Sequence, residues 1–425
     1  MPDNLQEENL KLKRAVNELQ ILNEISAAIS AFLGSEEVNH LIVQKCMKYF
    51  EAEQGAIWRL KEEEQNISPE TFVREMDMEY NGLPFKIGAS LAGWILKHRR
   101  PLLVNNLAED KFFSKLTDEY SRIHCFAAVP LTIKNRIIGI LSLFNKKTEE
   151  GFTRDDIRML SIVALQSAQV IENARLYDEE KKLRELEDDQ KAARHIQQTL
   201  LPDKNPSLEN YDITGISNPA KMVGGDYYDY IELKQDKWGI AVADVSGKGT
   251  PAALLMASLQ TCLTEQAGLN MSVSETIDKV NQVFSRFLKS KRFITMIYGL
   301  LDLKKNTFTY VNAGHNYPLI ITRDGNVRQI EGSDLILGIS REAIYQEREL
   351  SLQKGEILLI YTDGITEATN SVGEMYGEQR LEFLLKDSQF LSAAELKKRI
   401  LDSVQKFQGD AIQSDDITVV VIKHI

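Results

Sequence analysis

Five aspartates in the second half of the chain stand at the ends of short apolar runs, where strands are expected to begin or end. They are Asp226, Asp244, Asp363, Asp415 and Asp416. Clusters made only of carboxylates suit hard, octahedral cations such as Mg²⁺ or Mn²⁺. Zinc is disfavoured, because His315 is the only histidine between residues 196 and 423. The pattern predicts a divalent-cation site whose ligands are distant from one another in the sequence.

Each of these aspartates also has a simpler explanation as a turn or cap residue. Asp363 precedes Gly364, and Asp415 and Asp416 follow Ser414, which are common turn signals. A single aspartate of this kind is explained best in that way. Four strand ends that all carry an aspartate favour the metal site, because converging carboxylates repel one another and a cation relieves the repulsion.

Two nucleotide sites are suggested by short motifs but disfavoured by the neighbouring residues. The stretch VGGDYYDY shares Gly-Gly-Asp with the GGDEF signature of nucleotide cyclases, yet Tyr227 and Tyr228 stand where Glu-Phe is required. VSGKGTP is not a phosphate-binding P-loop, because Val242 occupies the position of the first glycine and Gly249 replaces the Ser/Thr. These residues therefore disfavour a nucleotide site at either motif.

Composition narrows the class of protein. The net charge of −11 disfavours nucleic acid as a partner, since phosphate binding needs a basic face. The chain contains neither a run of about 18–20 apolar residues nor a signal peptide, and no basic amphipathic helix indicates a membrane partner. Three widely spaced cysteines fit neither a disulfide framework nor a zinc site, and they indicate a reducing, cytoplasmic location.

The last part of the chain alternates apolar runs with turns. Strands are predicted for residues 238–244, 294–302, 308–314, 317–323, 356–363 and 417–425. Several are apolar on both faces, as expected for packed sheets covered by outer helices. One helix is predicted to begin at Gly249-Thr250-Pro251, and a second to span Ser272–Leu288.

The first half of the chain contains an antiparallel hairpin followed by a long helix. AAVPLTI (127–133) and RIIGILSLFN (136–145) are the predicted strands, and Pro130 places the first at an edge or a bulge. Thr153 and Asp156 predict a capped helix start. That helix is predicted to run on to Leu201, since residues 173–201 contain no Pro or Gly.

Leucines in this helix recur at heptad spacing. Leu176 and Leu183 keep one heptad position, whereas Glu179, Gln190 and Gln197 interrupt the seam. The other position is kept by Leu186, Ala193 and Leu200. An imperfect two-stranded coiled coil, and hence a homodimer, is favoured over a solvated single helix. Residues 3–33 also show heptad spacing, which fits a partner helix and a lone amphipathic helix equally well.

Five ordered motifs from about residue 190 to 425 resemble the SpoIIE/RsbU branch of the metal-dependent, PPM-type (type 2C-like) serine/threonine protein phosphatases. They are VGGDYYD, ADVSGKG, NAGHNYP, YTDGITEA and SDDITVVV. The resemblance implies an α-β-β-α sandwich with two Mn²⁺ or Mg²⁺ ions. It also implies that paired cations activate a water molecule that attacks phosphorus in line.

The same resemblance implies roles for individual residues. Asp244 would bridge both ions, and Asp226 would complete one of them with the Val245 carbonyl. Asp363 and Asp415 would hold the other ion, a role that Asp416 could share. Many relatives carry Asp-Gly-His where this chain has Asp244-Val245-Ser246, so a water ligand is the expected proton donor. We expect His315 to stabilise a turn, and Lys248 to be a solvated loop residue.

Residues 34–170 resemble a GAF sensor domain. The stretches that carry this resemblance are EAEQGAIWRL, LAGWILKHRRPLLVNN and AAVPL…IIGILSLFNKK. Asn145-Lys146, Phe152 and Asp156 partly match the NKFDE pattern of cyclic-nucleotide-binding members, but Ile157 stands where Glu is expected. An ordinary hairpin-to-helix connection is favoured over a nucleotide site, so the activator is an unknown ligand or a protein.

These observations predict an α+β chain of four parts: an N-terminal helix (1–33), a GAF-like α/β sensor domain (34–170), a coiled-coil linker (171–202) and a phosphatase domain (203–425). By resemblance, the substrate is a phosphorylated anti-sigma-factor antagonist, and the helical pair after Asp244 acts as a switch. The alternative is a GAF-containing scaffold that sequesters such a partner without turnover.

Overall fold

The computed structural model describes residue 16 and residues 35–60, 67–74, 85–113, 123–288 and 292–425. The chain divides into two compact units, Met1–Glu185 and Leu186–Ile425, and each is described by itself. The helix predicted for residues 1–33 lies outside the described residues, apart from Val16. The predicted domain boundaries stay a prediction.

The first unit is built on a five-stranded antiparallel sheet of order β2-β1-β5-β4-β3. Its strands are β1 (Ala52–Leu60), β2 (Ile67–Arg74), β3 (Leu102–Val104), β4 (Phe126–Ile133) and β5 (Arg136–Lys146). Successive residues of β4 pack on opposite faces: Ala127 and Val129 belong to one apolar cluster, and Phe126 and Ala128 to the other. Both faces of this sheet are therefore covered.

The predicted hairpin is confirmed. Strands β4 and β5 pair from Phe126↔Phe144 to Ile133↔Arg136. Pro130 pairs with Ile140 beyond the residues of β4 that pair with β3, and a register irregularity follows directly after Leu131. The missing N–H of Pro130 thus costs the sheet no ladder bond towards β3.

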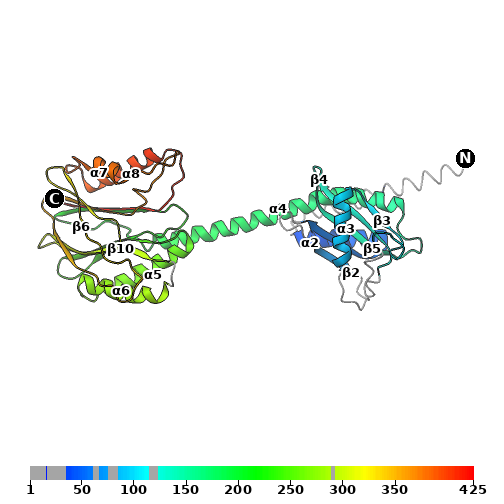
Figure 1. The fold of residues 1–425 in the computed structure, drawn as a ribbon, viewed down its shortest axis with the longest axis horizontal. Helices are drawn as coiled ribbons and strands as arrows, with labels where there is room; N and C mark the ends of the chain where they lie inside the picture. Colours follow the sequence, from blue (N-terminus) through cyan, green and yellow to red (C-terminus); the bar gives the residue numbers. More distant parts are fainter. Residues whose placement is uncertain (1–15, 17–34, 61–66, 75–84, 114–122, 289–291) are drawn as a thin grey trace. The chain divides into compact units, whose positions relative to one another are not determined.

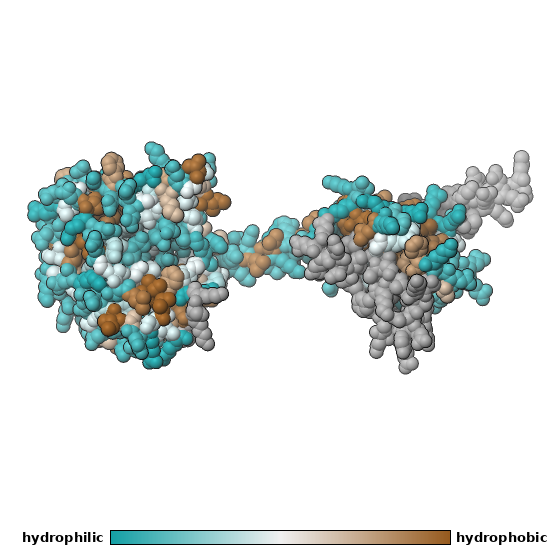
Figure 2. Space-filling view, viewed as in Figure 1, coloured by the Kyte–Doolittle hydropathy of each residue, from teal (hydrophilic) through white to brown (hydrophobic). Residues whose placement is uncertain are grey.

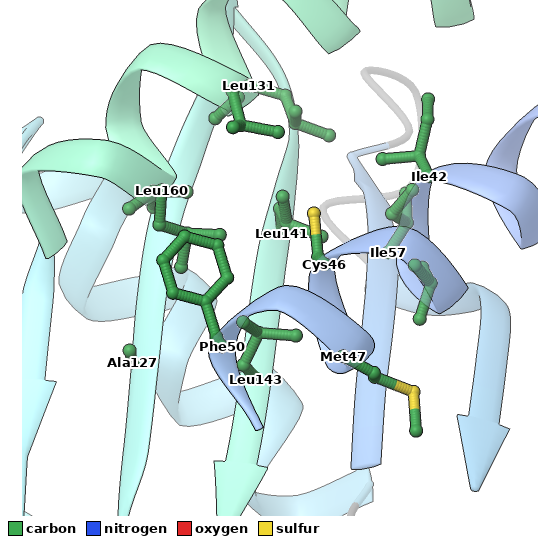
Figure 3. Close-up of a cluster of buried hydrophobic side chains, with 14 of the residues drawn as sticks. Ile42, Cys46, Met47, Phe50, Ile57, Ala127, Leu131, Leu141, Leu143 and Leu160 are labelled. Carbon is green, nitrogen blue, oxygen red and sulfur yellow. The ribbon is translucent and has the colours of Figure 1, made fainter. Parts of the chain in front are cut away.

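Three helices cover this sheet: α2 (Ser35–Phe50), α3 (Phe85–His98) and the first turns of α4 (Arg154–Gln198). Figure 3 shows Cys46 and Phe50 of α2 packed over the sheet in the same cluster as Leu141, with Phe50 beside Leu160 of α4. Leu91 and Ile95 of α3 belong to the cluster on the opposite face. The unit is a sheet sandwiched between helices, as the GAF resemblance implies.

Helix α4 is one continuous helix of 45 residues (Figure 1). The predicted cap is confirmed, because Thr153 Oγ1 accepts from the Asp156 N–H and Asp156 Oδ2 accepts from the Thr153 N–H. The helix ends at Gln198, three residues short of the predicted Leu201. Its last buried residue is Ile171, and the side chains of the following part of the helix are exposed or only partly buried.

The second unit contains two antiparallel sheets. One has the order β14-β11-β10-β9-β8, and its strands are β8 (Tyr227–Glu232), β9 (Lys237–Val245), β10 (Ile294–Asp302), β11 (Thr307–Ala313) and β14 (Arg348–Ser351). The other has the order β13-β12-β15-β16-β7-β6, and its strands are β6 (Ser207–Leu208), β7 (Tyr211–Asn218), β12 (Leu319–Ile321), β13 (Val327–Gln329), β15 (Ile357–Tyr361) and β16 (Ile417–His424).

The two sheets pack face to face and carry helices on their outer faces (Figure 1). The pair α5 (Thr250–Ala267) and α6 (Val273–Phe287) covers the first sheet, and α7 (Glu378–Leu385) with α8 (Ala393–Gln408) covers the second. Capping boxes at Ser272–Glu275 and Ser392–Glu395 fix the starts of α6 and α8. The predicted α-β-β-α sandwich is confirmed.

All six strands predicted in this unit are present, although β12 is shorter than the predicted 317–323. Strands β7 and β8 and helices α7 and α8 were not predicted individually. Among the described residues, no helix is both long enough and apolar enough to cross a membrane.

Candidate metal centre

Strand register brings Asp226 and Asp244 together. Asp226 immediately precedes β8, Asp244 is the penultimate residue of β9, and these strands pair with Tyr227 opposite Ala243. One further step along the ladder places Asp226 beside Asp244. Asp226 is only 4% exposed, so its carboxylate lies inside the sandwich rather than on a surface turn.

The second sheet supplies the other carboxylates at its facing edge. Strand β15 ends at Tyr361, which pairs with Val419 of β16, so Asp363 and Asp415 continue from adjacent strand ends. A side-chain contact joins the two sheets here, because Thr362 Oγ1 donates to Asp226 Oδ2 at 2.8 Å. Segments far apart in the sequence therefore meet at one edge of the sandwich.

The acidic groups perturb one another. Burial, followed by repulsion from Asp363, raises the pKa of Asp244 to about 7. Burial, with repulsion from Glu367 and Asp415, raises the pKa of Asp363 to about 6. Burial first, and then the charge of Asp244, raises the pKa of Asp226 well above its ordinary value. The site concentrates negative charge in a poorly solvated place, which a divalent cation would relieve.

Gly225 lets the backbone approach this cluster closely. A Cβ at this position would lie 2.6 Å from the Val245 carbonyl oxygen, so only glycine fits beside that carbonyl. Carboxylate and carbonyl oxygens are the donors that Mg²⁺ and Mn²⁺ prefer. The donor set therefore fits the expected ions, although no group of three His, Cys, Asp or Glu side chains among the described residues stands at metal-binding distances.

Lys248 is an exposed loop residue, as expected, and it also pairs with one of these carboxylates. Its Nζ is 2.8 Å from Asp415 Oδ2 and also donates to the Ser414 carbonyl. Its charge acts to lower the pKa of Asp244 and of Asp363, opposing the effect of burial. The ammonium thus supplies positive charge at the edge where cation binding is expected.

Asp416 anchors a loop of backbone. Its Oδ1 accepts from the Ala220 N–H at 2.7 Å, and its Oδ2 accepts from the Gly225 N–H at 2.6 Å. Both oxygens are therefore engaged by the segment that precedes Asp226. This arrangement distinguishes Asp416 from Asp415, which is 31% exposed and faces Lys248.

Sequence comparisons place the chain among known phosphatases. The model of the family "Stage II sporulation protein E (SpoIIE)" matches residues 234–425, and that of the family "GAF domain" matches residues 33–172. The phosphoserine phosphatase RsbU of Bacillus subtilis is 34% identical over 253 residues, which cover 58% of this chain and 75% of RsbU. The chain belongs to the SpoIIE family. The predicted resemblance to SpoIIE/RsbU-type phosphatases with an N-terminal GAF domain is confirmed.

A second curated relative and one solved structure are also similar to this chain. Phosphoserine phosphatase RsbP of Bacillus subtilis is 28% identical over 234 residues, covering 54% of this chain and 56% of RsbP. The solved structure of the "SiaA-PP2C domain of Pseudomonas aeruginosa" matches with a TM-score of 0.51 and 22% identity, covering 57% of this chain and 98% of that domain. The latter match supports the fold alone.

His315 occupies a buried turn of this SpoIIE-family chain. Its N–H donates to Asn312 Oδ1 at 2.8 Å, and Asn312 Nδ2 donates back to the His315 carbonyl at 3.1 Å. Its Nδ1 lies 2.8 Å from Thr295 Oγ1, and Thr295 pairs with Asp244 across the sheet. Burial lowers the pKa of His315 to about 4. These contacts agree with the expected turn-stabilising role.

Two residues that contact the site or its loop were not predicted from the sequence to do so. Thr362 donates a hydrogen bond to Asp226, and Gln197 of α4 donates one to Gly224, two residues before Asp226. Thr362 stands beside Asp363, so its proximity to the site was available as a signal. Gln197 offered only one signal, namely that it interrupts the leucine seam.

Proposed function

We propose that the chain is a Mn²⁺- or Mg²⁺-dependent protein phosphatase that hydrolyses phosphoserine or phosphothreonine on a regulatory protein. The observation that carries this proposal is the convergence of carboxylates from both sheets at one edge of the sandwich, where burial and mutual repulsion raise the pKa values of Asp226, Asp244 and Asp363. Membership of the SpoIIE family supports it, since the relatives RsbU and RsbP are named phosphoserine phosphatases.

The proposed ligand assignments are those that the family resemblance implies. Asp244, Asp226 and the Val245 carbonyl would hold one ion, and Asp244 with Asp363 and Asp415 would hold the other. Between the two adjacent acids, Asp415 is the better candidate, because it is 31% exposed, whereas Asp416 is buried and holds the loop before Asp226 through both of its oxygens. We assign Asp416 to holding the loop that carries Asp226.

A pair of divalent cations supplies, when bound, Lewis acidity and charge neutralisation for phosphoryl transfer to water. The protein's own part is to hold its carboxylates in place, and Thr362 does so for Asp226 by hydrogen bonding to Oδ2. Lys248 adds a positive charge at this edge, because the Nζ of its exposed side chain lies 2.8 Å from Asp415 Oδ2. Ser246 Oγ accepts from the Phe293 N–H at 2.8 Å and so serves the local turn.

The substrate and the input are proposed from the family. A phosphorylated anti-sigma-factor antagonist is the proposed substrate, and an unidentified ligand or protein acts on the GAF unit. Exposed leucines on α4 support the proposed homodimer. Three free thiols, Cys46, Cys125 and Cys262, support the proposed cytoplasmic location.

Phosphate release from a phosphoserine protein, with and without Mn²⁺, tests this function. The full chain is expected to release phosphate only with the cation, and Asp363→Asn is expected to lower the rate at least a hundredfold with an unchanged circular dichroism spectrum. Asp236→Asn is the matched control, because Asp236 is exposed and its ion pair is with Lys304. Tight binding of the phosphoprotein without turnover would instead support the scaffold alternative.

A further inference from the structure

One side chain in the last turn of α4 is hydrogen-bonded to a loop of the second unit. Gln197 Nε2 donates to the Gly224 carbonyl at 2.7 Å, and the Gly224 N–H donates back to Gln197 Oε1 at 3.1 Å. The two residues are 27 positions apart in the sequence. Because the amide engages both polar groups of a single residue, it fixes the orientation of that backbone as well as its position.

Gly224 is held equally closely on its other side. A Cβ there would lie 2.4 Å from Asp416 Oδ2, so the position admits only glycine without a shift of the anchor. The same Oδ2 accepts from the Gly225 N–H at 2.6 Å. The loop is thus fixed between a helix residue, Gln197, and an acid at the start of β16.

The clamped loop leads directly to a proposed metal ligand. Asp226 follows two residues after Gly224, and its carboxylate is fixed at the far end by the Thr362 hydroxyl. Gly225, between them, packs against the Val245 carbonyl, which is the other proposed ligand of the same ion. A displacement of Gly224 would therefore move both the Asp226 side chain and its spacing from Val245.

We propose that Gln197 is a positioning residue for the metal centre: through Gly224 it sets the place of Asp226, and it thereby couples the end of α4 to cation binding. This inference rests on the proposed metal-dependent function. It explains why a glutamine interrupts the leucine seam, since its amide is engaged by the loop. Gln197 is fourteen residues from Leu183 and shares its heptad position, so one face of α4 serves both a partner helix and the metal-bearing loop.

Titration calorimetry of the full chain with MnCl₂ tests this inference independently of turnover. Gln197→Ala is expected to weaken Mn²⁺ binding by about tenfold or more, because two hydrogen bonds that fix the loop are lost. Gln197→Met keeps the length and helix propensity of the side chain but neither bond, so it is expected to weaken binding similarly. Gln198→Ala, at the adjacent exposed position, is the matched control and is expected to bind Mn²⁺ as the parent does.

Kinetics supply a second readout. Saturating Mn²⁺ is expected to restore most of the phosphatase rate of Gln197→Met, with the KM for the phosphoprotein unchanged. Parental Mn²⁺ affinity in both Gln197 variants would overturn the inference, even with a lowered melting temperature, because a purely structural role predicts that result. A parent chain that neither binds Mn²⁺ nor releases phosphate would overturn the proposed function and this inference together.

Discussion

Among single residues, the carboxylates of the acidic cluster lower the stability of the folded protein at the place where cation binding is proposed. Asp226, Asp244 and Asp363 each have a raised pKa because they are buried near other acids. Such groups destabilise the folded protein when all of them are ionised. Functional sites commonly carry this kind of unfavourable electrostatics.

Asp244→Asn is therefore expected to stabilise the protein in EDTA at pH 8, by more than about 1 kcal/mol, while abolishing turnover. The folded pKa of Asp244 is about 7, above its ordinary value of 3.8. The parent thus gains stability as pH falls from 8 through 7, because the folded state takes up a proton there. Urea unfolding of both proteins at pH 8 and pH 6 measures this, and the advantage of Asp244→Asn should shrink at pH 6.

His315 is expected to lower the stability of the folded protein as pH falls, opposite to the effect of Asp244. Its folded pKa of about 4 lies below the ordinary 6.5, so the unfolded state binds the proton first as pH falls. The parent should lose up to about 3 kcal/mol between pH 6.5 and pH 4 through this group. Urea unfolding of His315→Gln across that range should show a smaller loss of stability towards acid pH than the parent shows. An identical pH dependence in the two proteins would contradict the assignment.

The sequence predicted the positions of the site residues better than their partners. Aspartates at strand ends could be identified because apolar runs and turn residues are local signals. The contacts of Asp416 with Ala220 and of Gln197 with Gly224 span 196 and 27 residues. Such contacts depend on how the sheets and the helix pack, which no local pattern encodes.

At the scale of elements, helix α4 carries the predicted dimer seam on its exposed part. Leu176, Leu183 and Leu186 are 50%, 61% and 59% exposed, and Figure 2 shows apolar side chains on this stretch between hydrophilic ones. Helical continuity was predictable from the absence of Pro and Gly. The end of the helix was not predictable in the same way. Pro202 indicated a helix up to Leu201, but Thr199 and Leu200 already form a turn.

Leu183→Glu is expected to shift the full chain from dimer to monomer at micromolar concentration, because it places a charge in the proposed apolar seam. Light scattering measures the change. Lys181→Glu alters charge by two units at an exposed position off the seam and is the matched control. A monomeric parent would show that the coiled-coil interpretation is wrong.

Strands with long apolar runs were predicted, whereas short or polar elements were not. β16 and β10 are buried almost throughout, and their sequences are correspondingly apolar. β13 has three residues and β14 has four, and in both strands partly buried residues alternate with exposed ones. Elements of this kind are stabilised by pairing with a neighbour rather than by their own composition.

At the scale of the whole molecule, the second unit contains all the proposed catalytic groups and its own apolar cores. A fragment spanning 186–425 keeps Gln197, whereas one spanning 203–425 lacks it. We expect both fragments to fold, and the longer one to bind Mn²⁺ about tenfold more tightly, because it retains the two hydrogen bonds to Gly224. Calorimetry on the two fragments measures this, and equal affinities would argue against coupling through the helix end.

We propose that carboxylates from two sheets hold divalent cations for phosphoester hydrolysis. The most direct measurement is the initial rate of phosphate release from a phosphoserine protein by the full chain, titrated with MnCl₂ from an EDTA-treated start. We expect no release in EDTA, a saturable rise with Mn²⁺, and no rise in Asp244→Asn. Release that persists in EDTA, or that Asp244→Asn retains, would contradict it.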